Sequence, residues 1–361
     1  MIKVIKSITE LEEIRECWDV LYEEDDNCTP FQSFDYNNIS WKRFHQGYSL
    51  FIILFYQNQE KTPCAIFPFC IDSKNCLRFI NEDHSDFQTA IVKESVKAEL
   101  KMYEEVYGFV KSQPDIDRIC LNHLRHDDLL LHYFGHISSY ARLYGTESYS
   151  YLPISSNQED GCSFIDSLRH LTAKERNRLK NIEKKAADLS FKIITIKSNE
   201  FPEKDVNELV HVMIDKGIRS TAYFTDNLLE FIKDLYQAGV LKIGIIYHDQ
   251  TLGSISFFYQ CKNGMCIQWI IVYSDKAYNL QAKLKIINSV YESGGGIFNF
   301  GRGTYAYKIQ HFKPIIQNLF CVDIPFRRKA RVRLMFQSFN DIMKKIKYRF
   351  SVLFSCFSKQ H

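Results

Sequence analysis

The sequence predicts a mixed α/β (α+β) fold with two tandem domains, each built on a mixed sheet, and a basic helical tail. Helix-like and strand-like patterns alternate along the 361 residues, as in proteins that pack helices on sheets. With 45% hydrophobic residues, a chain of this length can bury two cores. Residues 153–162 form the predicted linker, because proline, serines, acids and glycine follow one another there without periodicity. The domains are then residues 1–152 and 163–324, and the tail is residues 325–361.

The first predicted domain combines amphipathic helices with two strongly apolar strands. Apolar spacing predicts a strand at 2–6, helices at 8–22 and 34–44, strands at 49–57 and 63–70, a helix at 93–112, a strand at 117–122 and a short helix at 125–135. Strands and helices therefore alternate throughout this domain.

The second predicted domain has the clearest order of elements. A capping box, Thr172 with Glu175, precedes a helix whose apolar face reaches Leu189. The remaining elements are a strand at 191–196, helices at 204–217 and 225–238, strands at 241–248, 252–260 and 265–273, a helix at 276–292, a strand at 297–300, a short helix at 304–312 and a strand at 315–322. The last seven follow the order β-β-β-α-β-α-β, in which antiparallel hairpins lead into a crossover helix.

Charge is distributed unevenly along the chain. Residues 325–361 hold ten lysines and arginines against one acidic residue, so the first 324 residues of this chain of net charge +3 carry −6. An acidic body argues against nucleic acid as a partner. Cations alternate with apolar residues in the tail, which predicts either peripheral contact with an anionic inner membrane or docking on the acidic body.

The spacing of cysteines and histidines indicates the cellular compartment and whether a metal site is expected. The eleven cysteines include no CxxC pair and the eleven histidines are dispersed, so we expect no disulfide framework and no metal. The N-terminus has no apolar signal core, and the longest apolar run, Tyr48 to Tyr56, is too short to cross a bilayer. We therefore expect a cytoplasmic protein, peripheral at the inner membrane if the tail binds there.

Three motifs resemble those of one acyltransferase family. These are FQSFDYNNISWKRF at 31–44, LRFINEDHSDFQ at 77–88 and IFNFGRGTYAYKIQHFKP at 297–314, with the basic helix at 174–185 between the last two. The chain resembles the CelD-like acyltransferases of the GNAT superfamily, whose members typically carry Phe-Asp-Phe-x-x-Gly-x-x-x-Tyr-Lys. Here Asn299 stands in place of the acid.

The resemblance implies two GNAT-like domains, a plan shared with the Fem-type aminoacyl transferases of peptidoglycan synthesis. It also implies acyl transfer from acetyl-CoA or another acyl-CoA to an amine, such as an amino sugar in cell-envelope polysaccharide synthesis. One feature departs from the GNAT pattern. The helix at 276–292 lacks the glycine-rich loop on which such enzymes place a pyrophosphate.

The resemblance assigns candidate catalytic and donor-binding residues. Tyr307 and Lys308 stand where related proteins present an acid or a functional lysine, and Asp275 is the candidate base. Tyr307 packing in the core, Lys308 reaching solvent and Asp275 capping a helix are the alternatives. The residues expected to hold acyl-CoA, partly through the backbone of a splayed strand, are Ile270, Ile271, Tyr273, Asn279, Gln281 and Lys283.

Four further residues are candidates for binding the acceptor. Arg302 lies between two glycines and suits an anion, unless it is an ordinary surface arginine. His84 and Asp86 can form a base and the group that orients it, unless they form a hydrogen-bonded turn. Trp41 belongs to the first of the three motifs.

Two alternatives to an acyl-CoA enzyme remain open at the level of sequence. A Fem-type transferase that uses aminoacyl-tRNA is favoured by the basic helix, whose Arg176, Arg178, Lys180, Lys184 and Lys185 form either a wall for phosphates or a solvated face. A catalytically inactive module that binds glycans or nucleotides is favoured by Asn299 and by the missing glycine loop.

Overall fold

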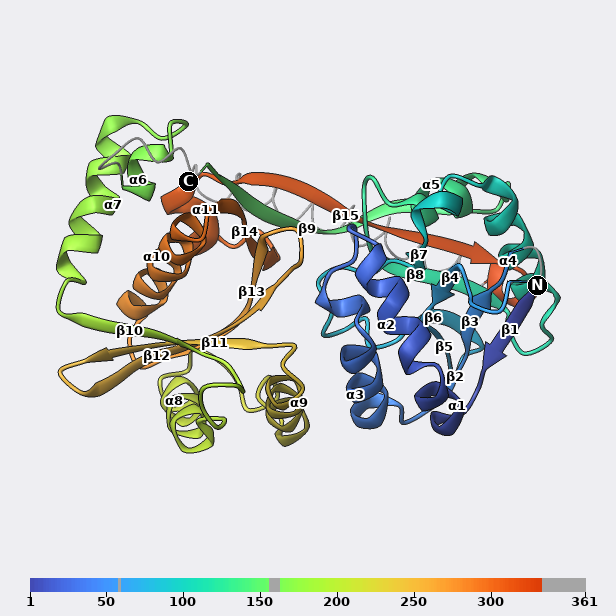
Figure 1. Ribbon diagram of the computed structural model, residues 1–361, viewed down its shortest axis with the longest axis horizontal. Coiled ribbons are helices and arrows are strands. Elements are labelled where there is room, and N and C mark those ends of the chain that lie inside the picture. Colours follow the sequence, from blue (N-terminus) through green and yellow to red (C-terminus); the bar gives the residue numbers. More distant parts are fainter. Residues whose placement is uncertain (58–59, 156–162, 333–361) are drawn as a thin grey trace, which may run out of the picture.

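The computed structural model describes residues 1–57, 60–155 and 163–332. Figure 1 shows two halves side by side, joined by two long strands that run from one half to the other. A single sheet of eleven strands passes through both halves in the order β10-β11-β12-β13-β14-β9-β15-β8-β6-β5-β2. Helices pack against this sheet and against a second sheet of four strands, so the fold is mixed α+β, as predicted.

The N-terminal half contains both sheets. Its helices are α1 (Ile8–Glu13), α2 (Arg15–Glu24), η1 (Pro30–Gln32), α3 (Phe34–Phe44), η2 (Glu94–Val96), α4 (Leu100–Ser112) and α5 (Leu129–His136). Strands β1 (Ile2–Ile5), β3 (Ile52–Phe55), β4 (Ala65–Phe67) and β7 (Ile91–Val92) form the small sheet. Strands β2 (Tyr48–Leu50), β5 (Phe69–Asp72), β6 (Cys76–Phe79) and β8 (Arg118–Arg125) belong to the large one.

The two apolar strands predicted at 49–57 and 63–70 are each divided between the sheets. β2 and β5 pair in the large sheet, whereas β3 and β4 pair in the small one. The breaks fall at Phe51 and at Pro68, and a proline has no N–H to donate to a strand ladder. The predicted helix at 8–22 is likewise two helices, which meet at Ile14.

The C-terminal half follows the predicted order of elements. Its helices are α6 (Phe164–Ser167), α7 (Ala173–Lys185), α8 (Glu203–Asp215), α9 (Asp226–Gln237), α10 (Lys276–Glu292) and α11 (Ala306–Phe312). Its strands are β10 (Leu189–Ile194), β11 (Lys242–His248), β12 (Thr251–Gln260), β13 (Met265–Tyr273) and β14 (Gly295–Arg302). The predicted capping box is present, because Thr172 and Glu175 exchange hydrogen bonds at the start of α7.

Strands β9 (Arg142–Ser155) and β15 (Ile315–Pro325) connect the halves. β9 lies between β14 and β15, and β15 also pairs with β8 of the N-terminal half. The sequence did not predict β9, and the first three residues of the predicted linker belong to it. The last strand of the C-terminal half thus completes the sheet of the N-terminal half.

Polar contacts also fix the halves relative to each other. Arg43 of α3 forms an ion pair with Asp234 of α9 at 2.6 Å. Lys262, in the turn between β12 and β13, donates to the carbonyl of Tyr22 and lies over its ring, 4.6 Å from the centroid. The two halves are therefore fixed relative to each other, and so are the walls of a cavity between them.

The basic tail is described only in its first residues. Residues 328–332 are helical, and the rest of the predicted tail, residues 333–361, lies outside the described residues. Within the described ranges, no helix has both the length and the apolar character that crossing a membrane requires.

Candidate functional site

The site begins where two neighbouring parallel strands separate. β13 and β14 pair only between Met265–Ile267 and Ile297–Asn299. β14 then follows β9, whereas β13 stays paired with β12 as far as Tyr273. The separation opens a cleft of about 370 Å³, whose walls include Ile270 and Ile271. The resemblance implied a splayed strand at this place, and residues 268–271 of β13 line the cleft.

A glycine turn at the end of β14 shapes the floor of the cleft. Gly301 has φ of +71°, and a Cβ there would lie 2.6 Å from the carbonyl oxygen of Gln268 and 2.7 Å from Asp86 Oδ2. Only glycine fits such a close approach with this backbone conformation. Asn299, which stands in place of the family's acid, is buried and accepts a hydrogen bond from Gly301 N at 2.9 Å. Asn299 thus supports the turn.

Lys308 points from α11 into the cleft. It is 8% exposed, and its Nζ donates to the carbonyl of Arg302 at 2.6 Å. Burial lowers the pKa of Lys308 to about 8, and nearby Arg219 and Arg302 add to this, although Asp86 opposes it. The alternative in which Lys308 reaches solvent is therefore wrong. Tyr307 lies in α11 beside it, and its side chain is outside the described part of the structure.

A second buried lysine faces the same cleft from α10. Lys283 is 2% exposed, and its amino group donates to Asn279 Oδ1. Burial lowers the pKa of Lys283 to about 7, and the positive charge of Lys308 lowers it further. The cleft thus holds two amino groups whose protonation changes near neutral pH. A cluster of perturbed groups in a cavity is typical of functional sites.

Arg302 ties the C-terminal half to a loop of the N-terminal half. Its guanidinium lies 3.6 Å from Asp86 and 3.4 Å from Glu147, and it donates to the carbonyl of Asp83 at 2.7 Å and to His123 Nε2 at 2.6 Å. The sequence analysis predicted Arg302 as an anion-binding residue, but its guanidinium is engaged by these protein groups. Arg302 instead positions the loop that carries His84 and Asp86.

His84 and Asp86 both line the cleft but have different partners. Asp86 is 5% exposed, and it also accepts a hydrogen bond from the backbone N of Arg302 at 3.2 Å. Burial raises the pKa of Asp86, although Arg302 opposes this. The ring of His84 packs on Phe44, with centroids 4.6 Å apart, and burial lowers its pKa. His84 is therefore mainly neutral at pH 7, and one of its ring nitrogens can accept a proton.

The residues predicted to hold acyl-CoA are divided between the cavity walls and the helix. Tyr273 and Asn279 line a side pocket of about 540 Å³, which shares Ile270, Ile271 and Lys283 with the cleft. Gln281 lies on α10, half-buried, and is not among the residues that line either cavity.

Asp275 caps α10, as the structural alternative proposed. Its carboxylate accepts a hydrogen bond from Ala277 N at 2.8 Å, and the residue does not line the cleft or the side pocket. Trp41 lines a separate pocket of the N-terminal half, which shares Asp83 and His84 with the cleft.

Several residues of the cleft had no signal in the sequence. Glu147 comes from β9, which was not predicted, and Arg219 and Tyr223 lie in the segment between α8 and α9. His123 is buried with φ of +60°, and burial together with Arg302 lowers its pKa to about 3. Only the tertiary fold brings these residues together.

Comparison with known proteins extends the description of the fold. No family model and no curated protein matches the sequence. Among solved structures, FemX has a TM-score of 0.58 at 10% identity, covering 90% of this chain and 97% of that one. L-PGS from Bacillus licheniformis has a TM-score of 0.55 at 13% identity, covering 89% and 94%. The C-terminal domain of a putative lysylphosphatidylglycerol synthetase from Agrobacterium fabrum has 0.54 at 11%, covering 90% and 95%.

These likenesses show the fold. The chain shares the fold of FemX and of L-PGS over about nine-tenths of its length, and its two halves fit the two GNAT-like domains that the resemblance implied. The narrower resemblance to the CelD-like family stays a prediction.

Proposed function

We propose that this protein is a transferase that passes an activated acyl group to an amine in the cleft between its halves. The observation that carries the proposal is the pair Lys283 and Lys308, two buried amino groups at the point where β13 and β14 separate. Cations fixed in a site with little water stabilise the negative charge that develops on an acyl oxygen far better than they do in bulk solvent. The similarity to FemX and L-PGS supports the class of transferase.

The proposed reaction makes an amide. The neutral amine attacks the carbonyl carbon, the bond from this carbon to the leaving oxygen or sulfur breaks, the new amide nitrogen gives up a proton, and the leaving group takes one up. Lys308, with a pKa of about 8, is protonated at pH 7, stabilises the oxyanion and can donate that proton. His84 takes the proton of the incoming ammonium, because burial keeps its imidazole neutral. Asp275 has no role in this scheme, since it caps α10.

The start of α10 makes aminoacyl-tRNA the better supported donor. GNAT enzymes place the pyrophosphate of CoA at the corresponding helix N-terminus, but here the carboxylate of Asp275 occupies the backbone N–H of Ala277. A carboxylate at that position repels a second anion. The glycines that would let a pyrophosphate approach are also missing.

The basic face of α7 supports the same donor. Lys174, Arg178 and Lys185 line an open groove along this helix. Burial lowers the pKa of His311, which lines the side pocket, and the charge of Arg178 lowers it further. Arg178 is therefore near enough to the side pocket to act on it electrostatically, which fits a phosphate-rich carrier that delivers its acyl end to the cleft.

Acyl-CoA is the second candidate donor, and the side pocket favours it. Ile270, Ile271, Tyr273 and Asn279 line a cavity beside the unpaired edge of β13, where the resemblance places a thioester. An amino sugar of cell-envelope polysaccharide remains the acceptor that the resemblance implies. Binding of the tail to an anionic membrane remains a prediction.

A comparison of the two donors in separate reactions tests the proposal. Purified protein is incubated with glucosamine or n-butylamine and either a mixture of charged tRNAs or acetyl-CoA, and amide products are measured by mass spectrometry. We expect amide from the charged tRNAs and none from acetyl-CoA. If amide forms from acetyl-CoA alone, acyl-CoA is the donor and the aminoacyl-tRNA assignment is wrong. If no amide forms from either donor, the inactive binding module is favoured.

A further inference from the structure

The pocket that Trp41 lines lies in the N-terminal half, next to the cleft. It has a volume of about 170 Å³ and is enclosed by α3, β2, β5, β6 and the loop that follows β6. This is smaller than the roughly 300–1,000 Å³ of pockets that hold a whole drug-sized ligand, so it suits one end of a molecule. We call it the N-terminal pocket.

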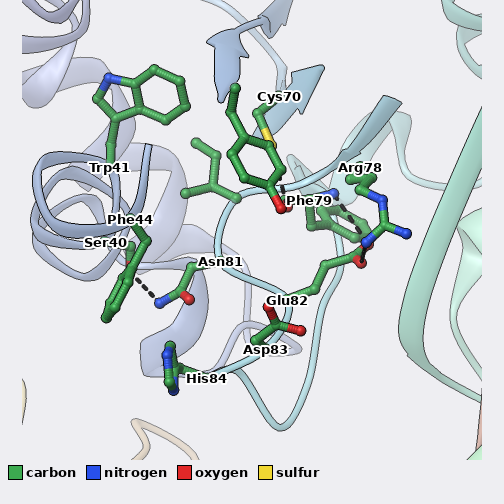
Figure 2. A pocket seen from close by; sticks show the side chains of 12 residues that line it. Ser40, Trp41, Phe44, Cys70, Arg78, Phe79, Asn81, Glu82, Asp83 and His84 are labelled. Atoms are coloured by element: carbon green, nitrogen blue, oxygen red, sulfur yellow. Dashed lines mark hydrogen bonds and ion pairs between the residues drawn. The ribbon is translucent and has the colours of Figure 1, made fainter. Parts of the chain in front are cut away.

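Aromatic rings and polar groups both line this pocket. Figure 2 shows Trp41 and Phe44 on one side, and the pair of Arg78 and Glu82 on the opposite side. Asp83 lies beside Glu82. Tyr48 adds a further aromatic ring to the lining. The electron-rich face of an aromatic ring attracts cations.

The charge balance of the N-terminal pocket is negative. Its one arginine, Arg78, lies 3.1 Å from Glu82 and 3.3 Å from Asp72. Burial raises the pKa of Glu82 to about 7, although Arg78 opposes this, so Glu82 is only partly ionised at pH 7 and Asp72 balances most of the charge of Arg78. Glu82 is 6% exposed and also accepts a hydrogen bond from Asn122 Nδ2 at 2.8 Å. Asp83 adds an exposed carboxylate to the lining. The pocket therefore disfavours phosphates and carboxylates and favours a cation.

The position of the N-terminal pocket relates it to the cleft. Asp83 and His84 line both cavities, so they form the wall between them. Arg302 holds this wall in place through the carbonyl of Asp83 and the carboxylate of Asp86. A cation bound in the pocket is thus adjacent to His84, the group that accepts a proton in the proposed reaction.

We propose that the N-terminal pocket binds a protonated primary amine and is the acceptor subsite of this transferase. The aromatic rings and Asp83 hold the ammonium before it passes the wall at His84 into the cleft. The assignment to the acceptor rests on the proposed function, whereas ammonium binding does not. The shared chemistry is the ammonium group, carried by an amino sugar or by an aliphatic amine.

Calorimetric titration of the full chain tests the binding. The probes are glucosamine and n-butylamine, with N-acetylglucosamine as the uncharged control. We expect both ammonium probes to bind at millimolar concentration and N-acetylglucosamine to bind at least about tenfold more weakly. A preference for glucosamine over n-butylamine would identify an amino sugar, and the reverse preference an aliphatic amine. Equal binding of glucosamine and N-acetylglucosamine would overturn the proposal.

Two variants locate the binding site. Asp83→Asn removes one exposed carboxylate without a change of shape, and we expect it to weaken ammonium binding about tenfold. Asp249→Asn makes the same change at an exposed turn between β11 and β12, and binding should stay at the wild-type level. Unchanged binding in Asp83→Asn would overturn the proposal.

Lys308→Met separates this proposal from the proposed function. The variant should bind ammonium as the wild type does, because Lys308 does not line the N-terminal pocket. If amide formation fails with every donor while ammonium binding persists, the transferase is wrong and the pocket stands. If amide forms but Asp83→Asn binds amines normally, the pocket assignment is wrong and the transferase stands.

Discussion

The cleft and the N-terminal pocket share a wall but differ in the balance of charge. The cleft holds four cationic side chains and three acidic ones, which are Arg219, Lys283, Arg302, Lys308, Asp83, Asp86 and Glu147. The N-terminal pocket combines aromatic rings with one arginine, Arg78, and the acids Glu82 and Asp83. A cationic cavity suits an anionic carrier and a developing oxyanion, and an acidic aromatic one suits an ammonium. In the proposed reaction, charge would therefore direct the donor to the cleft and the acceptor to the N-terminal pocket.

The turn at Gly301 packs against Gln268 and Asp86 of the cleft, and its loss should have the largest effect. Gly301→Ala forces a Cβ against Gln268 and Asp86 in a left-handed backbone conformation. We expect a loss of at least about 2 kcal/mol in the free energy of unfolding, measured by urea denaturation.

Gly108→Ala is the matched control for that change. Gly108 lies in α4, and a Cβ there meets no atom within 4 Å. Alanine should leave the stability equal or raise it by up to about 1 kcal/mol. Equal stability of the two variants would show that the turn does not need its glycine.

Lys308→Met should slow amide formation about a hundredfold, because one cation that stabilises the transition state is lost. Methionine keeps most of the buried volume, so circular dichroism should match that of the wild type. Lys101→Met, at a lysine whose side chain is 84% exposed, is the control and should retain full activity. A rate for Lys308→Met within twofold of the wild type would remove Lys308 from the mechanism.

His84→Gln should lower the rate by about ten- to a hundredfold and change its pH dependence. The wild-type rate should fall only as the pH drops below the lowered pKa of His84, when the base becomes protonated. In the glutamine variant this acidic limb should disappear. His132→Gln, on the exposed side of α5, is the control. Survival of the limb in His84→Gln would assign the titration to another group.

Lys283 should limit stability at neutral pH. The pKa of Lys283 is about 7 in the folded protein, below its usual value. Between pH 7 and about 10.4 the unfolded chain therefore binds more protons at this group than the folded protein does. The free energy of unfolding rises with pH across that range for this reason. Lys283→Met should therefore raise the unfolding midpoint in urea at pH 7, and the gain should shrink by pH 9.5. A gain that does not change with pH would contradict the burial of a titrating amine.

Local periodicity predicted the elements that are set by local sequence. Helices α3 and α10 have the predicted bounds, 34–44 and 276–292, and three antiparallel strands precede α10 as expected. The sequence missed β9, because Arg142–Ser155 alternates poorly and is ordered by strands far away in the chain. The split at Pro68 depends on two sheets that a linear pattern does not reveal.

The candidate site was also predicted only in part, because some of its residues are brought together by contacts between distant segments. The sequence analysis named Lys308, Arg302, His84 and Asp86 as candidates. The structure places them at one cleft and adds Glu147 and Arg219 from segments with no motif. Burial of Lys308 and the four contacts of Arg302 depend on packing between the halves. Spacing along the chain carries no information on such packing.

Steady-state kinetics with a varied amine acceptor tests the division between pocket and cleft most directly. We expect Asp83→Asn to raise KM for the amine about tenfold. The assay is run at about pH 8, where His84 is neutral with or without the charge of Asp83, so kcat should stay unchanged. Lys308→Met should lower kcat about a hundredfold with KM for the amine unchanged, because it acts only on the transition state. If both variants change the same parameter, the two cavities do not divide donor chemistry from acceptor binding.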